Sequence, residues 1–219
     1  MRGRQASLSR FDALVLDFDG VVLESVDVKT RAFTELYEEH GPEVVAKVVA
    51  HHLVHGGVSR FEKFRLYHRS FLGRELDARE EAALGERFTA LVEDAVVAAP
   101  WVAGAHEYLE MNYRRLPIFV ASGTPETELA RIVQRRGIAH YFAGVHGSPR
   151  TKGKIIATCI REGRFHATRV LMVGDSITDY EGAQEAGAAF LGIARDRSAF
   201  PSSVPLLPDL TGLARFMAA

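Results

Sequence analysis

The chain has 219 residues, 47% of them hydrophobic, which is enough to bury a core for one domain or a domain and a half. A formal net charge of -1 gives no electrostatic reason to bind nucleic acid or an anionic membrane, and no apolar stretch is long enough to span a bilayer. The single cysteine excludes an internal disulfide and is typical of a reducing compartment, so we expect a soluble cytoplasmic protein. The basic segment 1–10 leads into no apolar signal-peptide core and is expected to be an ordinary terminus.

The first apolar run, Ala13–Leu16, predicts a strand buried on both faces, as in a parallel sheet. Asp17 and Asp19 follow at once, and Gly20 permits a sharp turn. Residues two apart on an extended chain point to the same side, so the two carboxylates can converge. At about 5 Å they repel by roughly 3 kcal/mol if the effective dielectric is near 20. Such a pair requires a cation, a shared proton or both.

The next region, 25–99, shows helical apolar spacing and no convincing strand. It is punctuated by Gly56-Gly57 and closed by Pro100. We therefore expect an all-helical cap domain, 25–99, inserted after the first strand. The core domain would then consist of 1–24 and 100–219.

Apolar runs and helix-patterned segments alternate after position 100. Strands are expected at 117–121, 141–145, 169–173 and 188–193, and helices at 102–113, 125–136, 152–161 and 177–186, with a loop at 201–208 before a short last helix. This alternation predicts an α/β fold: a Rossmann-like parallel sheet with right-handed crossovers and helices on both faces. Ligands bind beyond the carboxyl ends of such strands, where Asp17, Ser122 and Asp175 are expected.

Four segments, in order and over nearly the whole chain, resemble the motifs of the haloacid dehalogenase superfamily. They are Asp17-Phe18-Asp19-Gly20-Val21, Ser122 after a strand, a lysine near position 152, and Gly174-Asp175-Ser176 with Asp179. The helical insertion between the first two resembles the first cap class of that family. Phosphoglycolate phosphatase-like and β-phosphoglucomutase-like members share this cap class.

The resemblance implies the chemistry of phosphoryl transfer. Asp17 would be the nucleophile and carry an aspartyl-phosphate intermediate. Asp19 would protonate the leaving oxygen and then accept a proton from the hydrolytic water. Ser122 and a lysine would hold the phosphoryl oxygens, with Lys152 the first choice and Lys154 the alternative.

Magnesium suits a site built only from oxygen ligands. The implied ligands are Asp17, Asp175 and the backbone carbonyl of Asp19, with Asp179 in support. Asp19 also argues against dehalogenation, because a halide leaves without an acid, whereas an alcohol or sugar needs one.

Further residues are expected to bind the substrate. Gly20, Gly123 and Thr124 would line the phosphoryl site. In the cap, the segment 56–60 resembles the Gly-Val-Ser-Arg segment of β-phosphoglucomutase. We therefore expect Arg60, with Lys63, to bind an anionic group at the far end of the substrate, since a guanidinium fits two oxygens at once.

Two enzymatic alternatives stay open. A phosphomutase is disfavoured because Glu24-Ser25 and then Lys29 stand where the mutase has Asp-Thr and a histidine. A phosphonatase-like Schiff base on Lys29 or Lys63 is disfavoured because such an amine should be desolvated, whereas Lys63 follows Glu62 in a charged neighbourhood.

Two non-enzymatic or metal alternatives also arise. Of His51, His52 and His55, only His51 and His55 are one helical turn apart, and two histidines without a nearby third ligand are weak evidence for zinc, which usually takes at least three protein ligands. We expect the three histidines to be cap residues or polar groups facing the substrate. A receiver-like signalling module also combines aspartates, a hydroxyl group and lysine, but it carries no helical insertion after its phosphorylated strand.

The sequence thus predicts a magnesium-dependent phosphatase for a small phosphorylated metabolite, such as a sugar phosphate or a phosphoglycolate-like acid. A cap over the site makes proteins and long polymers poor substrates. No nucleic-acid or membrane partner is expected, and the chain could be a monomer or a homodimer.

Overall fold

The structure, a computed structural model, describes residues 10–218, so most of the basic segment 1–10 lies outside the described residues. Its centre is a six-stranded sheet in the order β3-β2-β1-β4-β5-β6, with every neighbouring pair parallel. The strands are β1 (Ala13–Leu16), β2 (Ile118–Pro125), β3 (Gly144–Ser148), β4 (Val170–Gly174), β5 (Ala189–Ile193) and β6 (Leu206–Leu207). The chain begins in the middle of the sheet and winds outward in both directions, which confirms the predicted α/β class.

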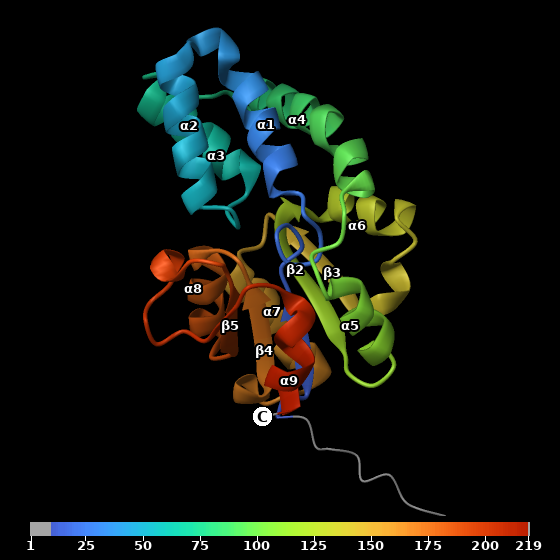
Figure 1. Cartoon of the computed structure of the whole chain (residues 1–219). Coiled ribbons are helices and arrows are strands. Elements are labelled where there is room, and N and C mark those ends of the chain that lie inside the picture. The colour runs from blue at the N-terminus through green and yellow to red at the C-terminus, as the bar shows by residue number, and fades with distance from the viewer. Residues whose placement is uncertain (1–9, 219) are drawn as a thin grey trace, which may run out of the picture.

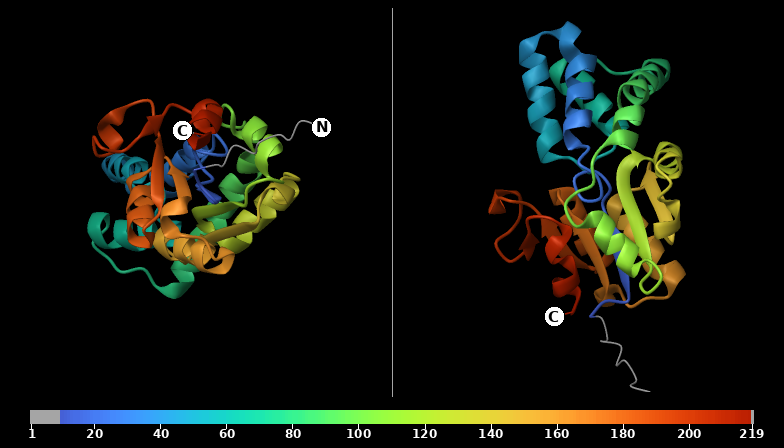
Figure 2. Two further views of the ribbon diagram at one scale, coloured as in Figure 1. Left: turned by 90° about the horizontal axis from the view of Figure 1, so that it is seen from below. Right: turned by 45° about the vertical axis from the view of Figure 1, so that its right-hand side comes forward.

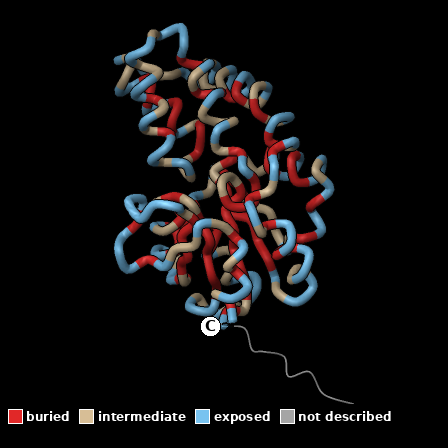
Figure 3. The backbone as a smooth tube through the Cα atoms, in the orientation of Figure 1, coloured by how far each residue is buried: buried red, intermediate tan, exposed pale blue. Residues whose placement is uncertain are grey.

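Alternate strand residues define two apolar layers, one on each face of the sheet. Leu14 and Leu16 belong to one layer, and Ala13 and Val15 to the other. The helices that contribute to the first layer are α5 (Ala105–Asn112), α6 (Glu126–Arg135) and α9 (Leu213–Ala218). Those of the second are α7 (Lys152–Gly163) and α8 (Ile177–Ala186). Figure 3 shows the buried positions running along the strands, as a sheet covered on both faces requires.

Four helices between β1 and α5 form the cap. They are α1 (Val26–Tyr37), α2 (Pro42–Val54), α3 (Arg60–Phe71) and α4 (Ala78–Ala98). They stand together beyond the carboxyl ends of the strands (Figures 1 and 2). Their interior is aromatic: the ring of Phe33 packs against Phe64, Tyr67 and Phe88. The predicted helical cap after the first strand is confirmed.

The two chain segments that join cap and core run side by side. The amide of Glu24 donates to the carbonyl of Pro100 at 2.9 Å, and that of Val102 to the carbonyl of Val22 at 3.1 Å. These hydrogen bonds join the segment just before residue 25 to the segment just after residue 99, so we keep 25–99 as the proposed bounds of the cap.

Most expected core elements are confirmed to within a few residues, with two exceptions. The strand expected at 141–145 was misplaced: a 3-10 turn, Ala139–Tyr141, comes first and buries Tyr141, so β3 begins at Gly144. The loop expected at 201–208 contains β6, which pairs with β5 at the sheet edge. Further 3-10 turns lie at 38–40, 167–169, 197–199 and 210–212. Within residues 10–218, no helix combines the length and apolarity that crossing a membrane requires.

Candidate active site

The predicted site residues gather at the carboxyl ends of three adjacent strands. Asp17 follows β1, Ser122 and Thr124 lie in the last part of β2, and Asp175 follows β4. Since β1 pairs with β2 on one side and β4 on the other, residues more than a hundred positions apart meet at one edge. Lys152, the first residue of α7, and Asp179, in the first turn of α8, complete the group.

Three carboxylates form the centre of the site. Oxygens of Asp17, Asp175 and Asp179 all lie within 4.8 Å of one another, the only such group of potential ligands among residues 10–218. Burial, with repulsion from Asp179 and Asp19, raises the pKa of Asp17 to about 7 despite the attraction of Lys152. Burial and the charge of Asp17 likewise raise the pKa of Asp175 well above its usual range. A divalent cation would relieve this repulsion, and an all-oxygen donor set fits Mg²⁺.

Lys152 is buried against two of these acids. Its Nζ lies 2.6 Å from Asp17 Oδ1 and 2.5 Å from Asp179 Oδ1, and it donates to the carbonyl oxygen of Ala121 at 2.7 Å. Burial lowers the pKa of Lys152, but the attraction of the Asp17 and Asp179 carboxylates is larger, so the net effect is a raised pKa. Lys154, the alternative, is exposed. The structure therefore brings Lys152, and not Lys154, into the site.

Asp179 positions this lysine. Its Oδ2 accepts hydrogen bonds from the amide and the hydroxyl of Ser176, at 3.1 and 2.6 Å, and closes a capping box at the start of α8. Only its Oδ1 faces Lys152. A metal role for Asp179 therefore stays a prediction, since one oxygen is already held by the helix cap.

Gly20 allows two chain segments to approach closely at the same edge. Its φ of +82° favours glycine, and a Cβ there would lie 2.1 Å from Asp175 Oδ2. Any side chain would displace that carboxylate. Gly20 thus shapes the acid cluster, whereas direct contact with substrate stays a prediction.

Asp19 is held apart from the acid cluster by a cap lysine. Lys29 Nζ lies 2.5 Å from Asp19 Oδ2 and donates to Thr124 Oγ1 at 2.7 Å, and Ser25 donates to Asp19 Oδ1 at 2.6 Å. Burial would raise the pKa of Asp19, but Lys29 and Ser25 together lower it. Sequence reasoning treated Lys29 mainly as a departure from the mutase pattern. Its position one turn into the helix after the acidic loop was the available signal.

The hydroxyl of Ser122 faces inward and does not cap a helix. It is buried, and its Oγ accepts from the amide of Thr124 at 3.1 Å. Helix α6 begins at Glu126 with Pro125 before it and no side-chain cap. Gly123 lies against the cap, since a Cβ there would meet the carbonyl oxygen of Gly57 at 2.6 Å. The cap loop therefore closes directly over the strand that carries Ser122.

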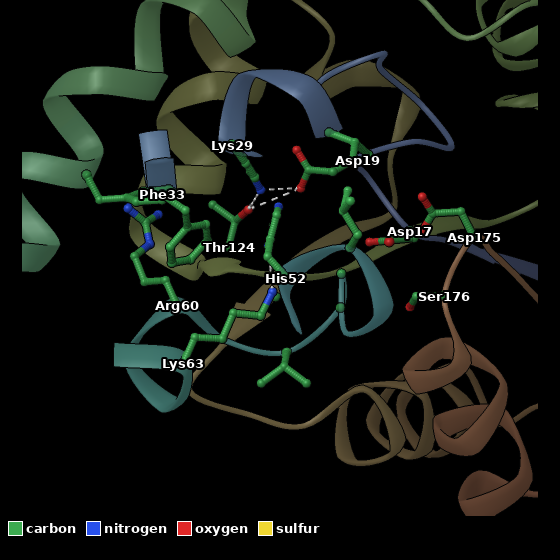
Figure 4. Close-up of a pocket in the computed structure, with 17 residues that line it drawn as sticks. Asp17, Asp19, Lys29, Phe33, His52, Arg60, Lys63, Thr124, Asp175 and Ser176 are labelled. Atoms are coloured by element: carbon green, nitrogen blue, oxygen red, sulfur yellow. Dashed lines mark hydrogen bonds and ion pairs between the residues drawn. The ribbon is translucent and has the colours of Figure 1, made fainter. Parts of the chain in front are cut away.

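A cavity of about 670 Å³, its open mouth included, runs between cap and core. Figure 4 shows Asp17 and Asp175 toward one end, Arg60 and Lys63 toward the other, and Lys29 with Asp19 between them. The cavity has the size of a small-metabolite site.

Arg60 and Lys63 both reach this cavity, but their surroundings differ. Arg60 forms a buried ion pair with Glu128 of α6, 2.5 Å between Nη2 and Oε1. Lys63 is 2% exposed, and its Nζ lies 2.9 Å from His52 Nδ1. Burial and the charge of Lys29 lower the pKa of Lys63 to about 7. The expectation that Lys63 is not desolvated was wrong, because Glu62 is exposed while Lys63 is buried against the ring of Phe33. The ground given above for disfavouring a Schiff base on Lys63 therefore does not hold.

The other two histidines of this segment are His51, in the last turn of α2, and His55, the residue that follows α2. His51 Nδ1 lies 3.1 Å from the hydroxyl of Tyr67, and the rings of His51 and His55 are 4.3 Å apart. His52 turns inward instead and lines the cavity. Of the three histidines, His52 is therefore the polar group that faces the site.

A family model of haloacid dehalogenase-like hydrolases matches residues 11–187. The chain belongs to this family. The match spans every residue of the acid cluster as well as the whole cap, so the site described above is that of a haloacid dehalogenase-like hydrolase. The family resemblance inferred from the four motifs is thereby confirmed.

Solved structures share the fold of this haloacid dehalogenase-like hydrolase over nearly its full length. A predicted phosphoglycolate phosphatase from Haemophilus somnus 129PT is 16% identical, with a TM-score of 0.74 over 95% of this chain and 99% of that one. β-Phosphoglucomutase from Clostridium difficile is 12% identical, with a TM-score of 0.77 over 95% of this chain and 97% of that one. YfnB from Bacillus subtilis, described as a HAD-hydrolase bound to magnesium, is 16% identical, with a TM-score of 0.71 over 96% of this chain and 100% of that one. No curated protein sequence matches the chain significantly.

Proposed function

We propose that this haloacid dehalogenase-like hydrolase is a magnesium-dependent phosphatase of a small phosphorylated metabolite. One observation carries the proposal: two carboxylates two residues apart, Asp17 and Asp19, are held in different environments. Asp17 lies against Lys152 in the acid cluster, while Asp19 is bound by Lys29 and Ser25. Carboxylates separated in this way can take different roles in one reaction.

Asp17 is the proposed nucleophile. Its carboxylate oxygen forms a bond to phosphorus as the bond from phosphorus to the leaving oxygen breaks, which leaves an aspartyl phosphate. Lys152 lies beside it, and the Ser122 hydroxyl lies 3.5 Å from the neighbouring Asp19 Oδ2; these two groups would bind the phosphoryl oxygens as charge develops on them. Magnesium, held by Asp17, Asp175 and the carbonyl of Asp19 with Asp179 nearby, would neutralise the same charge when bound.

Asp19 is the proposed acid and base. It gives a proton to the leaving oxygen in the first step and accepts one from the water that attacks the aspartyl phosphate in the second. The contact with Lys29 favours the carboxylate, which is the form the second step needs. The first step needs the protonated acid, so Asp19 has to take up a proton from solvent, against this contact, before it gives one to the leaving oxygen.

The named relatives support this reading without deciding the substrate. A phosphatase and a phosphomutase share the fold, and one neighbour binds magnesium. Hydrolysis is favoured here because Lys29 stands where the mutase has a histidine. We also propose that the protein lies in the reducing cytoplasm, which is consistent with the buried, free thiol of Cys159.

The test is a phosphate-release screen over small phosphate esters with magnesium, run with the wild-type chain, Asp17→Asn and Asp94→Asn. Asp94 is an exposed cap residue and serves as the matched control. We expect release by the wild type and Asp94→Asn only. No release above the Asp17→Asn level on any ester would overturn the proposal. A phospho-Asp17 stable for hours would instead favour a receiver-like role, and a product that keeps its phosphate would indicate a mutase.

A further inference from the structure

Lys63 and His52 form a buried polar pair in the cap wall of the active cavity. They are 2% and 4% exposed, and both line the cavity that contains Asp17 and Asp19. Lys63 Nζ lies 2.9 Å from His52 Nδ1 and 5.5 Å from the centre of the Phe33 ring. Among the described residues, no carboxylate lies within ion-pair distance of Lys63. A buried cation of this kind is unfavourable unless an anion joins it.

Every other cation that lines this cavity already has an acidic partner. Lys29 is paired with Asp19 and Arg60 with Glu128. Arg60 also donates to Thr89 and lies 4.5 Å over the ring of Phe88. For Arg60 to bind a substrate group, it would have to leave these partners. Lys63 has no acid to leave.

The hydrogen-bond roles of the pair indicate what it can bind. An ammonium only donates, so Nδ1 of His52 accepts from Lys63 and the proton of the neutral imidazole lies on Nε2. Burial and the charge of Lys63 keep His52 neutral by lowering its pKa to about 3. His52 Nε2 is buried and has no hydrogen-bond partner within the described part of the chain. The pair therefore offers further donors and no free ring acceptor.

We propose that Lys63 and His52 bind a second anionic group of the substrate, a carboxylate or a second phosphate, while its phosphoryl group lies at Asp17. This inference rests on the proposed phosphatase function and specifies its substrate class. An anion supplies both the charge that Lys63 lacks and an acceptor for His52 Nε2. Arg60 is then a structural link between cap and core, not the receptor for that group. The substrate is a small phosphate ester with an acid at its far end.

Two pairs of esters test the proposal, each differing in the far group. 3-Phosphoglycerate is compared with glycerol 3-phosphate, and fructose 1,6-bisphosphate with fructose 6-phosphate. The wild type should prefer the anionic member of one pair, and that pair identifies carboxylate or phosphate. In Lys63→Met, kcat/KM for this member should fall by about tenfold to a hundredfold, mainly through KM, while the uncharged member changes far less. His52→Gln should give the same pattern, more weakly.

Lys47→Met is the matched control, because Lys47 is an exposed cap lysine paired with Glu43. Equal losses on both members of a pair, or no wild-type preference in either pair, would overturn the inference. If Lys63→Met fails to fold, His52→Gln and the wild-type preference decide.

If the wild type hydrolyses no ester, the proposed function fails, and the inference is then judged by calorimetric binding of the same four esters. Tighter binding of an anionic member by the wild type, lost in the variants, supports it. Equal binding of all four contradicts it.

Discussion

Two buried lysines, Lys152 in the core and Lys63 in the cap, face the same site from opposite sides in opposite electrostatic environments. Lys152 lies between Asp17 and Asp179, which raise its pKa. Lys63 lies against His52 and the ring of Phe33, and burial lowers its pKa. The comparison shows that burial alone does not define the role of a lysine. A lysine whose charge is balanced by neighbouring carboxylates is held in place within the site, whereas a buried lysine without such carboxylates is suited to binding an anion of the ligand.

The difference follows from how each region is built. The core brings strand ends together, and each strand end exposes a polar loop, so acids accumulate beside Lys152. The cap packs helices through aromatic faces, so a lysine on an inward face meets rings and not carboxylates. Substitutions on either side of the site, metal binding and pH should each test this contrast.

Lys152→Met should lower kcat by about a hundredfold to a thousandfold, because a donor to the developing phosphoryl charge is lost. Phosphate release on the best ester measures the effect. Lys154→Met, two positions along on the exposed side of α7, is the control and should keep near wild-type kcat. A larger loss in Lys154→Met than in Lys152→Met would show that the site lysine is misassigned.

Glu128→Gln should lower the free energy of unfolding by about 3 kcal/mol, because it leaves the buried charge of Arg60 without its partner. Urea unfolding measures the change. Glu93→Gln, which breaks the surface pairs of the partly buried Glu93 with the exposed Arg131 and Arg135, should cost less than about 1 kcal/mol. Similar small losses in both variants would show that Arg60 is not held by Glu128, and would return it as a candidate for substrate binding.

Magnesium should stabilise the wild-type chain, by about 2.7 kcal/mol at a hundred times its dissociation constant, because it relieves repulsion among the three carboxylates. Thermal unfolding with and without the metal, after chelation, measures this effect. Asp175→Asn should reduce the stabilisation strongly, whereas the exposed Asp94→Asn should not change it. An equal shift in wild type and Asp175→Asn would place the metal elsewhere.

The pH dependence of stability should identify Lys63. Its pKa is about 7 in the folded chain and near 10.5 when unfolded, so between these values the unfolded chain binds a proton that the folded chain lacks. Stability contributed by this group therefore rises with pH, by up to about 1.4 kcal/mol per pH unit. We expect the free energy of unfolding, measured with urea between about pH 7.5 and about pH 9.5, to rise more steeply with pH in the wild type than in Lys63→Met, by up to this slope. Parallel curves would mean that Lys63 is not desolvated.

Local pattern was enough to predict much of the core. The apolar run before Asp17 and the glycine after Asp19 indicated a strand followed by a turn, and β1 and Gly20 have this form. Thr151 caps α7 and so makes Lys152 its first residue, which is where the motif lysine was expected. The strand expected at 141–145 was misplaced because a short turn that buries Tyr141 carries no distinct local signal.

The sequence by itself determined the α/β order, the helical cap and the residues of the acid cluster, because strand ends and turns are encoded by neighbouring residues. Only the tertiary structure decided which charges meet across the cap and the core. Arg60 and Glu128 are 68 positions apart, and no local pattern relates them. The burial of Lys63 likewise depends on helices α1 and α4 folding over α3, since desolvation is a property of the packed side chains around a group and not of its neighbours in sequence.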